Sequence, residues 1–183
     1  MQDFDLVIVG AGVAGLTAAM VAARHGLKVA VVDQIGVGGQ ISNAERIGNF
    51  PGLPQGIAGH ELGPLLHEQA EAAGATFCLD TITAIEPGDR HVVRGAEVLR
   101  APAVIIAAGS ALRPLGIPGE ERLLGHGVSH CASCDGPFFK GQEVGVVGGG
   151  DAALDEALVL AEHAARVTVF HRGPTLKAQQ VLV

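Results

Sequence analysis

The chain has 183 residues, 48% of them hydrophobic, and its mean hydropathy is +0.37; this is enough apolar surface for one large domain or for one domain and part of another. A net charge of −7 and a pI of about 5.5 argue against a nucleic-acid partner, which normally requires a basic surface. Acids stand near the N-terminus where a signal peptide is positive, and no stretch is long enough to span a bilayer, so we expect a cytoplasmic protein without a membrane partner.

The first predicted elements form a β-α-β unit. Residues 4–9 are a short apolar run that predicts a buried strand, and an Ala-rich helix is expected over residues 13–25. Gly26 ends this helix, and residues 27–32 predict a second parallel strand that is closed by Asp33.

The middle of the chain predicts a long loop, one helix and three strands. Residues 34–59 are rich in Gly, Pro and Asn and lack periodicity, which is typical of a functional loop. Apolar spacing predicts a helix over 61–73 and strands over 76–86 and 91–99, with a Pro-Gly-Asp turn between the strands. Residues 103–107 predict another buried strand that ends at a glycine.

A second β-α-β unit follows a Gly- and Pro-rich connection over residues 110–127. It comprises a strand over 143–147, a glycine turn, a helix over 151–164 and a strand over 166–170. We therefore predict an α/β fold with two Rossmann-like domains, of three-layer β/β/α or α/β/α type. We expect the second domain and the C-terminal part of the first to be incomplete in this chain. The expected domains cover residues 1–115 and 116–183.

The turn after the first strand reads Gly10-Ala-Gly12-Val-Ala-Gly15, the G-x-G-x-x-G fingerprint of a dinucleotide site. Gly10 permits a tight bend, Gly12 lets the backbone approach a pyrophosphate, and Gly15 lets helix and strand pack closely. The helix N-terminus presents N–H groups to phosphates, and the Asp33 carboxylate can accept bonds from ribose hydroxyls. The alternative is a turn whose glycines serve packing alone. The candidate residues are Gly10, Gly12, Val13, Ala14, Gly15 and Asp33.

The second unit opens with Gly148-Gly-Gly150-Asp-Ala-Ala153, a G-x-G-x-x-A variant of the fingerprint. Its second strand is followed by basic residues, where NAD sites use an acid and NADP sites meet the 2′-phosphate. Arg172 is the main candidate for that phosphate, and the alternative is a solvated strand end. The candidate residues are Gly148, Gly149, Gly150, Asp151, Ala152, His171, Arg172 and Lys177.

A dithiol motif, Cys131-Ala-Ser-Cys134, lies between the two glycine turns. The spacing allows a small, reducible disulfide ring, and Asp135 is a candidate proton carrier for a departing thiolate. The main alternative is half of a zinc site, which needs four ligands. The further ligands that such a site could recruit are Cys78, His126 and His130.

The order of these motifs resembles that of the low-molecular-weight, bacterial-type thioredoxin reductases, a group of FAD/NAD(P)-dependent pyridine nucleotide-disulfide oxidoreductases. The resemblance runs along essentially the whole chain. Besides the two glycine turns and the Cys131–Asp135 segment, it is carried by Gly38-Gly-Gln40, Asn49-Phe-Pro-Gly52, Ile105-Ile-Ala-Ala-Gly109, Gly116-Ile-Pro-Gly119-Glu120 and His171-Arg172.

The resemblance implies FAD in the first site and NADPH in the second. By the same resemblance, Cys134 would be the sulfur nearest the flavin, Cys131 would attack the substrate disulfide, and Asp135 would be the acid–base group. It also implies flavin contacts from outside the first glycine turn, namely Gln34, Gly39, Gln40, Asn49, Ala107, Ala108 and Gly109.

Several positions depart from the family pattern. Ala108 stands where the family usually has Thr, and Gly48 stands where it has Glu. Gly173 replaces a second arginine after Arg172, and Lys177 replaces a further arginine. A single Arg and a Lys bind a phosphate less well than paired guanidinium groups, so NADH is an alternative to NADPH.

The leading hypothesis is an enzyme that passes electrons from NAD(P)H through FAD and the Cys131–Cys134 pair to a substrate disulfide. One alternative is a dithiol oxidase that uses FAD and oxygen without nicotinamide, and another is a non-catalytic flavin- or nucleotide-binding module. The resemblance suggests thioredoxin or another disulfide as the substrate and a homodimer as the assembly. We expect the chain to be a fragment of a longer protein.

Overall fold

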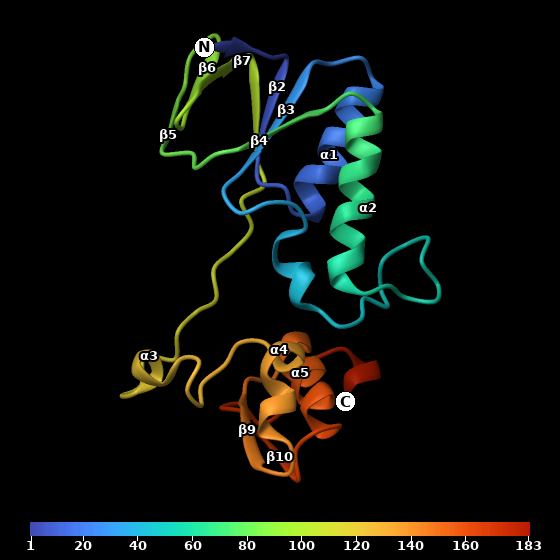
Figure 1. Cartoon of the computed structure of the whole chain (residues 1–183), viewed down its shortest axis with the longest axis vertical. Coiled ribbons are helices and arrows are strands. Elements are labelled where there is room, and N and C mark those ends of the chain that lie inside the picture. The colour runs from blue at the N-terminus through green and yellow to red at the C-terminus, as the bar shows by residue number, and fades with distance from the viewer. The chain divides into compact units, whose positions relative to one another are not determined.

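The computed structural model describes residues 1–183, which divide into two compact units, Met1–Ala111 and Leu112–Val183 (Figure 1). The expected change of domain after residue 115 falls just inside the second unit.

A parallel sheet lies at the centre of the first unit. Its strands run in the order β4 (Thr76–Leu79), β3 (Val29–Asp33), β2 (Leu6–Val9) and β8 (Ala103–Ile106). Because all four strands are parallel, their carboxyl ends meet at one edge of the sheet. The glycine turn after β2 therefore lies beside Asp33 at the end of β3.

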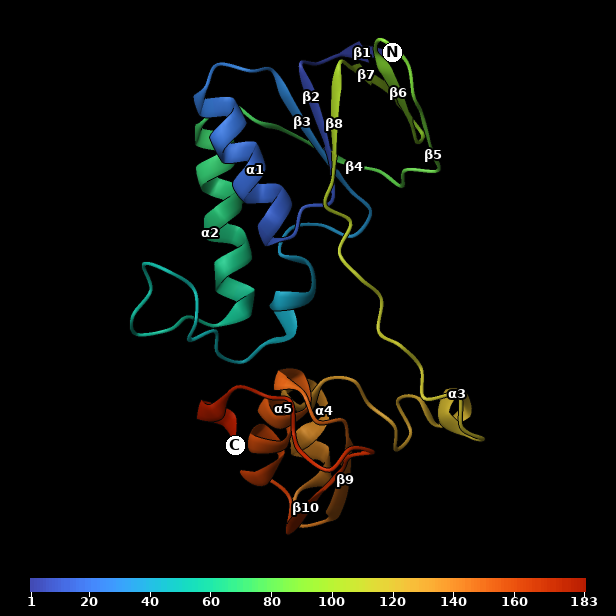
Figure 2. The same cartoon turned by 180° about the vertical axis from the view of Figure 1, so that it is seen from behind.

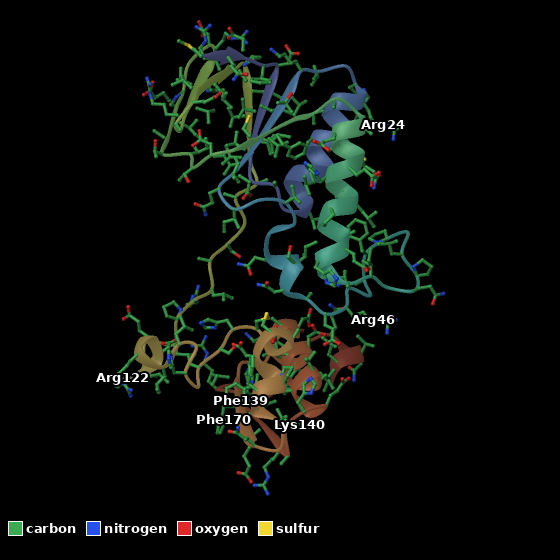
Figure 3. All side chains as sticks on the ribbon, viewed as in Figure 1. Arg24, Arg46, Arg122, Phe139, Lys140 and Phe170 are labelled. Carbon is green, nitrogen blue, oxygen red and sulfur yellow. A yellow bond between two sulfur atoms is a disulfide. The ribbon has the colours of Figure 1, made fainter.

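Two helices cover one face of this sheet, and both were predicted from the sequence as helices. They are α1 (Val13–Arg24) and α2 (Gly59–Ala72), which lie side by side in both views (Figures 1 and 2). Leu16 and Leu62 from the helices pack with alternate strand residues such as Val31 in one buried cluster. Arg24 extends from the last turn of α1 (Figure 3), where a positive charge complements the helix dipole.

A second sheet covers the opposite face and makes this unit a three-layer β/β/α arrangement. Its order is β1 (Gln2–Asp3), β7 (Val98–Ala101), β6 (His91–Arg94) and β5 (Ala84–Glu86); β1 and β7 are parallel and the other pairs antiparallel. The strand residues that point away from the helices, such as Val7 and Val32, join its buried side chains in a separate cluster. The predicted fold class is confirmed for this unit.

The two long strands predicted over 76–86 and 91–99 are wrong, since each is divided by a turn. β4 ends before Asp80, whose carboxylate accepts three backbone hydrogen bonds and turns the chain away from the parallel sheet. β6 ends at a turn in which the Gly95 N–H donates to the Glu97 carbonyl at 3.0 Å. The three N–H groups that bind Asp80 belong to Thr81, Ala96 and Glu97.

The strand predicted over 103–107 forms, as β8, but it is not buried. It is an edge strand with β2 as its one neighbour, and Ile105 and Ile106 are 40% and 71% exposed. The predicted loop over 34–59 includes one short 3-10 helix, η1 (Gly39–Asn43).

The second unit contains the second β-α-β unit. The strands β9 (Glu143–Val147) and β10 (Arg166–Phe170) are parallel and have the predicted bounds, and the Phe170 ring (Figure 3) lies over Gly145 of the neighbouring strand. Helix α5 (Asp151–Ala161) ends earlier than predicted because the residues after it bond to the segment before β9: the His163 carbonyl accepts from Gly141 N–H at 2.9 Å.

Four short elements of the second unit were not predicted from the sequence. Each is too short to show a hydrophobic period, so pattern analysis has no signal for it. They are α3 (Glu120–Leu123), α4 (Ala132–Asp135) and the 3-10 helices η2 (Gly136–Phe139) and η3 (Gln180–Leu182).

Candidate functional site

The first and third glycines of the first turn are required by the fold itself. Gly10 has φ +109°, and a Cβ there would lie 2.6 Å from the carbonyl carbon of Ala107 at the end of β8. A Cβ on Gly15 would collide with the carbonyl oxygen of Gly10. Their role in tight bending and close helix–strand packing agrees with the sequence interpretation.

Gly12 differs, because the surrounding protein leaves room for a side chain there. A Cβ on Gly12 would lie 3.9 Å from the Gly38 carbonyl oxygen, an ordinary contact distance. Gly12 is also the N-cap of α1, and no side chain caps this helix. The N–H groups of its first residues, Val13 and Ala14, are thus left for an anion, which is the arrangement a pyrophosphate needs.

The Asp33 carboxylate supports the glycine turn directly. Its Oδ2 accepts a hydrogen bond from Ala11 N–H at 2.8 Å, and its Oδ1 accepts from Ile35 at 2.8 Å and Gly36 at 3.0 Å. Partial burial acts to raise the pKa of Asp33, but these three donors outweigh it and hold the pKa below its usual value. The Asp33 carboxylate therefore has three hydrogen-bond partners within the protein itself.

Two further segments predicted from the family resemblance converge on the same turn. Gly38 N–H donates to the Ala11 carbonyl at 2.9 Å, which places Gly39 beside Gly12. The Gln40 amide donates to the Ser110 carbonyl at 2.7 Å and so joins this loop to the segment after β8.

The remaining predicted flavin contacts differ in how they relate to the turn. Ala107 lies beside Gly10, and its N–H donates to the Val9 carbonyl at 2.7 Å. The other predicted contacts, Gln34, Asn49, Ala108 and Gly109, are exposed, and neither the Gln34 nor the Asn49 side chain forms a hydrogen bond.

The second glycine turn repeats the geometry of the first with one change. Gly148 has φ +152°, and a Cβ there would lie 2.6 Å from the Cβ of Ala153, which stands where the first turn has its third glycine. Gly150 has open space around it and is the N-cap of α5, which no side chain caps. Like Gly12, it leaves a helix N-terminus accessible to phosphate.

His171 and Lys177, two of the three predicted basic residues, contact this turn. The His171 ring lies against Gly149, and Lys177 N–H donates to the Gly149 carbonyl at 2.6 Å. Arg172 is exposed and forms no ion pair. The structure thus brings the His171 ring and the Lys177 backbone to the turn that precedes α5, whereas Arg172 forms no hydrogen bond to it.

Asp151 and Ala152, the first residues of α5, are exposed. The Asp151 carboxylate accepts hydrogen bonds from the backbone N–H and the side-chain amide of Gln179, both at 2.7 Å. The side-chain amide of Gln179, followed by its backbone N–H, holds the pKa of Asp151 below its usual value. No local pattern could have identified Gln179, because it is 28 residues away along the chain.

Cys131 and Cys134 form a disulfide, with their Cα atoms 5.3 Å apart. Cys131 is the N-cap of α4, and its Sγ accepts a hydrogen bond from Cys134 N–H at 3.2 Å. Asp135 ends this turn and is partly buried, and its N–H donates to the Cys131 carbonyl at 3.1 Å. One helical turn therefore holds both sulfur atoms and the candidate acid.

Sequence analysis missed a partner of this turn on α5. The Glu156 carboxylate accepts a hydrogen bond from Ala132 N–H, the peptide group that follows Cys131. As with Gln179, the two residues are distant in sequence, separated by 24 positions, so no motif spacing could indicate the contact.

The residues of the zinc alternative are not gathered into a site. No three His, Cys, Asp or Glu side chains are grouped so that they could hold a metal ion. Cys78 lies on β4 and packs partly buried against the core, and burial raises the pKa of its thiol.

No helix combines the length and the apolar character that crossing a bilayer requires.

The chain contains two parallel β-α-β motifs with open glycine turns. The second motif lies in the same compact part of the chain as the Cys131–Cys134 disulfide. Together these features define a dinucleotide-binding protein with redox-capable cysteines. A family model described as pyridine nucleotide-disulphide oxidoreductase matches residues 4–181. The chain belongs to this family, and it is similar to thioredoxin reductases of several bacteria.

Named relatives and solved structures cover nearly the whole chain. It is 44% identical to a thioredoxin reductase of Treponema pallidum (98% of this chain, 59% of the relative) and 42% identical to one of Bacillus subtilis (98% and 57%). The crystal structure of Lactococcus lactis thioredoxin reductase in the FR conformation is similar, with a TM-score of 0.92, 41% identity and coverage of 98% of this chain and 59% of that one. The chain therefore spans less than two thirds of the length of these relatives.

Proposed function

We propose that this chain carries the redox centre of an FAD-dependent NAD(P)H:disulfide oxidoreductase of the thioredoxin reductase type. Electrons would pass from NAD(P)H to FAD and on to the Cys131–Cys134 disulfide, and the resulting dithiol would reduce a substrate disulfide. The observation that carries the proposal is that disulfide at the start of α4, in a chain with two open glycine turns. A protein that only bound nucleotides would have no use for the dithiol.

We assign the first unit to FAD, which supplies two-electron transfer between a nicotinamide and a disulfide. The fit depends on the room at Gly12 and on the uncapped N-terminus of α1, which together suit a pyrophosphate. Asp33 orients the turn and keeps lone pairs for a ribose hydroxyl. The further contacts assigned to FAD are Gln34, Gly39, Gln40, Asn49, Ala107, Ala108 and Gly109.

We assign the second unit to NAD(P)H, bound through the turn at Gly148–Gly150 and the N-terminus of α5. The exposed Arg172 guanidinium, with His171 and Lys177 nearby, favours NADPH, because these groups can bind a 2′-phosphate. NADH is the alternative, since one guanidinium and one ammonium give a weaker phosphate site than paired arginines.

The proposed exchange moves two electrons and balances at each step. The Cys131 thiolate attacks one sulfur of the substrate disulfide, forms a mixed disulfide and releases the other substrate sulfur as a thiolate, to which Asp135 delivers a proton. Asp135 obtains that proton from the Cys134 thiol, and the resulting Cys134 thiolate attacks the Cys131 sulfur, which closes the internal disulfide and releases the second substrate sulfur as a thiolate. The position of Asp135 in the same turn as both sulfur atoms supports its role as the proton carrier.

The names of the relatives support thioredoxin as the substrate, with another protein or small disulfide as the alternative. We further propose a homodimer acting in the cytoplasm. Analytical ultracentrifugation of the purified protein tests the dimer separately from the activity.

The activity is tested by rapid mixing of the flavin-loaded protein with NADPH. We expect the visible absorbance of the bound flavin to fall and a disulfide substrate to restore it. Cys134→Ser should abolish disulfide turnover and leave flavin reduction by NADPH intact. Cys78→Ala is the matched control, because its thiol lies on β4 of the other unit, and it should turn over normally.

Two results would contradict the proposal. If Cys134→Ser retains disulfide turnover, the electrons do not pass through this pair. If a dithiol substrate generates peroxide with oxygen and without NADPH while NADPH leaves the flavin oxidised, the protein is an oxidase.

A further inference from the structure

The dithiol turn is attached to α5 through one carboxylate. Glu156 lies on α5, and its Oε2 accepts a hydrogen bond from Ala132 N–H, the first peptide of α4. Ala132 is 5% exposed, so this N–H has little access to water. The bond therefore connects the peptide next to Cys131 to a longer and more rigid helix.

The carboxylate is held in an environment that disfavours its charge. Glu156 is partly buried, which raises its pKa; the Ala132 hydrogen bond opposes that effect, and the neighbouring Asp155 adds to it. Burial of an acid is unfavourable unless its partners compensate. Ala132 N–H is the one hydrogen-bond partner of the Glu156 carboxylate, and it belongs to the peptide group that follows Cys131.

That peptide group matters to the chemistry of Cys131. The first N–H groups of a helix have no internal acceptor, and they stabilise a thiolate placed at the N-cap. Cys131 is the N-cap, and its Sγ accepts from Cys134 N–H. Glu156 binds the Ala132 N–H and so places a negative charge at the same helix N-terminus as the Cys131 sulfur.

We propose that Glu156 is a positioning residue that sets the reduction potential of the Cys131–Cys134 pair. It anchors α4 through Ala132, and its charge destabilises the Cys131 thiolate. Reduction breaks the S–S bond and takes up two electrons and one proton, the equivalent of the hydride that the nicotinamide supplies in the proposed activity, and it gives the Cys131 thiolate and the Cys134 thiol. Because the carboxylate disfavours the thiolate form of the product, the dithiol becomes a stronger reductant. The inference relies on the proposed function only in taking this pair to be redox-active.

The test is the dithiol–disulfide equilibrium of the flavin-loaded protein in glutathione buffers at fixed pH, read by alkylation of Cys131 and Cys134. Glu156→Gln keeps an acceptor oxygen for Ala132 N–H and removes the charge. We expect it to shift the equilibrium three- to tenfold toward the dithiol, which is a potential higher by about 15–30 mV for a two-electron couple. Glu156→Ala also loses the anchor and should shift the equilibrium at least as far.

Glu162→Gln is the matched control, because it removes an acid from the exposed end of α5 that makes no side-chain hydrogen bond. It should move the equilibrium less than twofold. If Glu156→Gln shifts the equilibrium no more than this control, or shifts it toward the disulfide, the inference is wrong.

Failure of the proposed function gives a different result. If NADPH and substrate show no turnover but the pair titrates and Glu156→Gln shifts it as expected, the activity is wrong and the inference stands. If turnover occurs and the Glu156 variants have the same reduction potential as the wild type and the Glu162→Gln control, the inference alone is wrong.

Discussion

The hydrogen bonds of Asp33 allow one effect on stability to be calculated from the structure. In Asp33→Ala the N–H of Ala11, a residue 1% exposed, loses its acceptor where water has little access. A buried donor left without a partner costs about 1–3 kcal/mol. The other two donors, Ile35 and Gly36, lie in a loop where Ile35 is 85% exposed, and each contributes about 0.5–1 kcal/mol because water can replace the carboxylate.

We therefore expect Asp33→Ala to lower the free energy of unfolding by about 2–5 kcal/mol. With a urea dependence of about 2 kcal/mol per molar, the unfolding midpoint should fall by roughly 1–2.5 M. Far-UV circular dichroism is the suitable probe, since the chain has no Trp and no Tyr to report by fluorescence. Asp5→Ala is the matched control: Asp5 accepts one exposed backbone bond, from Lys28, and its loss should cost less than about 1 kcal/mol.

The pH dependence follows from the lowered pKa of Asp33. A carboxylate with a pKa lowered by folding contributes its stability fully above the unfolded value of about 3.9 and loses it as the pH falls through the folded value. The stability difference between the wild type and Asp33→Asn, which keeps one acceptor oxygen, should be constant from pH 8 to about pH 5 and shrink below about pH 4. Equal midpoints for Asp33→Ala and Asp5→Ala, or a difference that persists unchanged at acid pH, would refute this reasoning.

Two further predictions concern the nucleotide sites. Gly12→Ala should unfold like the wild type but lose bound FAD, because its methyl group fits the protein but occupies the approach to the helix N-terminus. Gly15→Ala should instead destabilise the fold by about 1–3 kcal/mol through overpacking. Thermal unfolding and flavin content measure the two effects, and full flavin retention by Gly12→Ala contradicts the proposed FAD site. Arg172→Ala should raise KM for NADPH roughly 10–100-fold through loss of about 1.5–3 kcal/mol of charged hydrogen bonding, with KM for NADH nearly unchanged in steady-state assays. Arg166→Ala, at the opposite end of β10 and paired with Glu143 at 3.6 Å, is its control, and an equal rise for both nucleotides means that Arg172 does not read the phosphate.

The sequence alone was sufficient for the elements whose signals are local. Apolar runs punctuated by glycine predicted β9 and β10 to the residue and α1 to within one residue, because strand and helix periods depend on neighbouring side chains. The glycine turns and the dithiol spacing are equally local, so the positions of both glycine turns and of the cysteine pair could be predicted from the order of residues alone.

Tertiary structure decided the features that join distant parts of the chain. The exposure of β8 depends on its place at the sheet edge, and the end of α5 depends on bonds to the segment before β9. Asp33 was predicted as a ribose ligand, but its bonds to the glycine turn required β2 and β3 to lie in register. The contact from Glu156 to Ala132 depends in the same way on how α4 packs against α5. Hydrogen bonds across such separations follow from packing, for which no local pattern of residue types carries a signal.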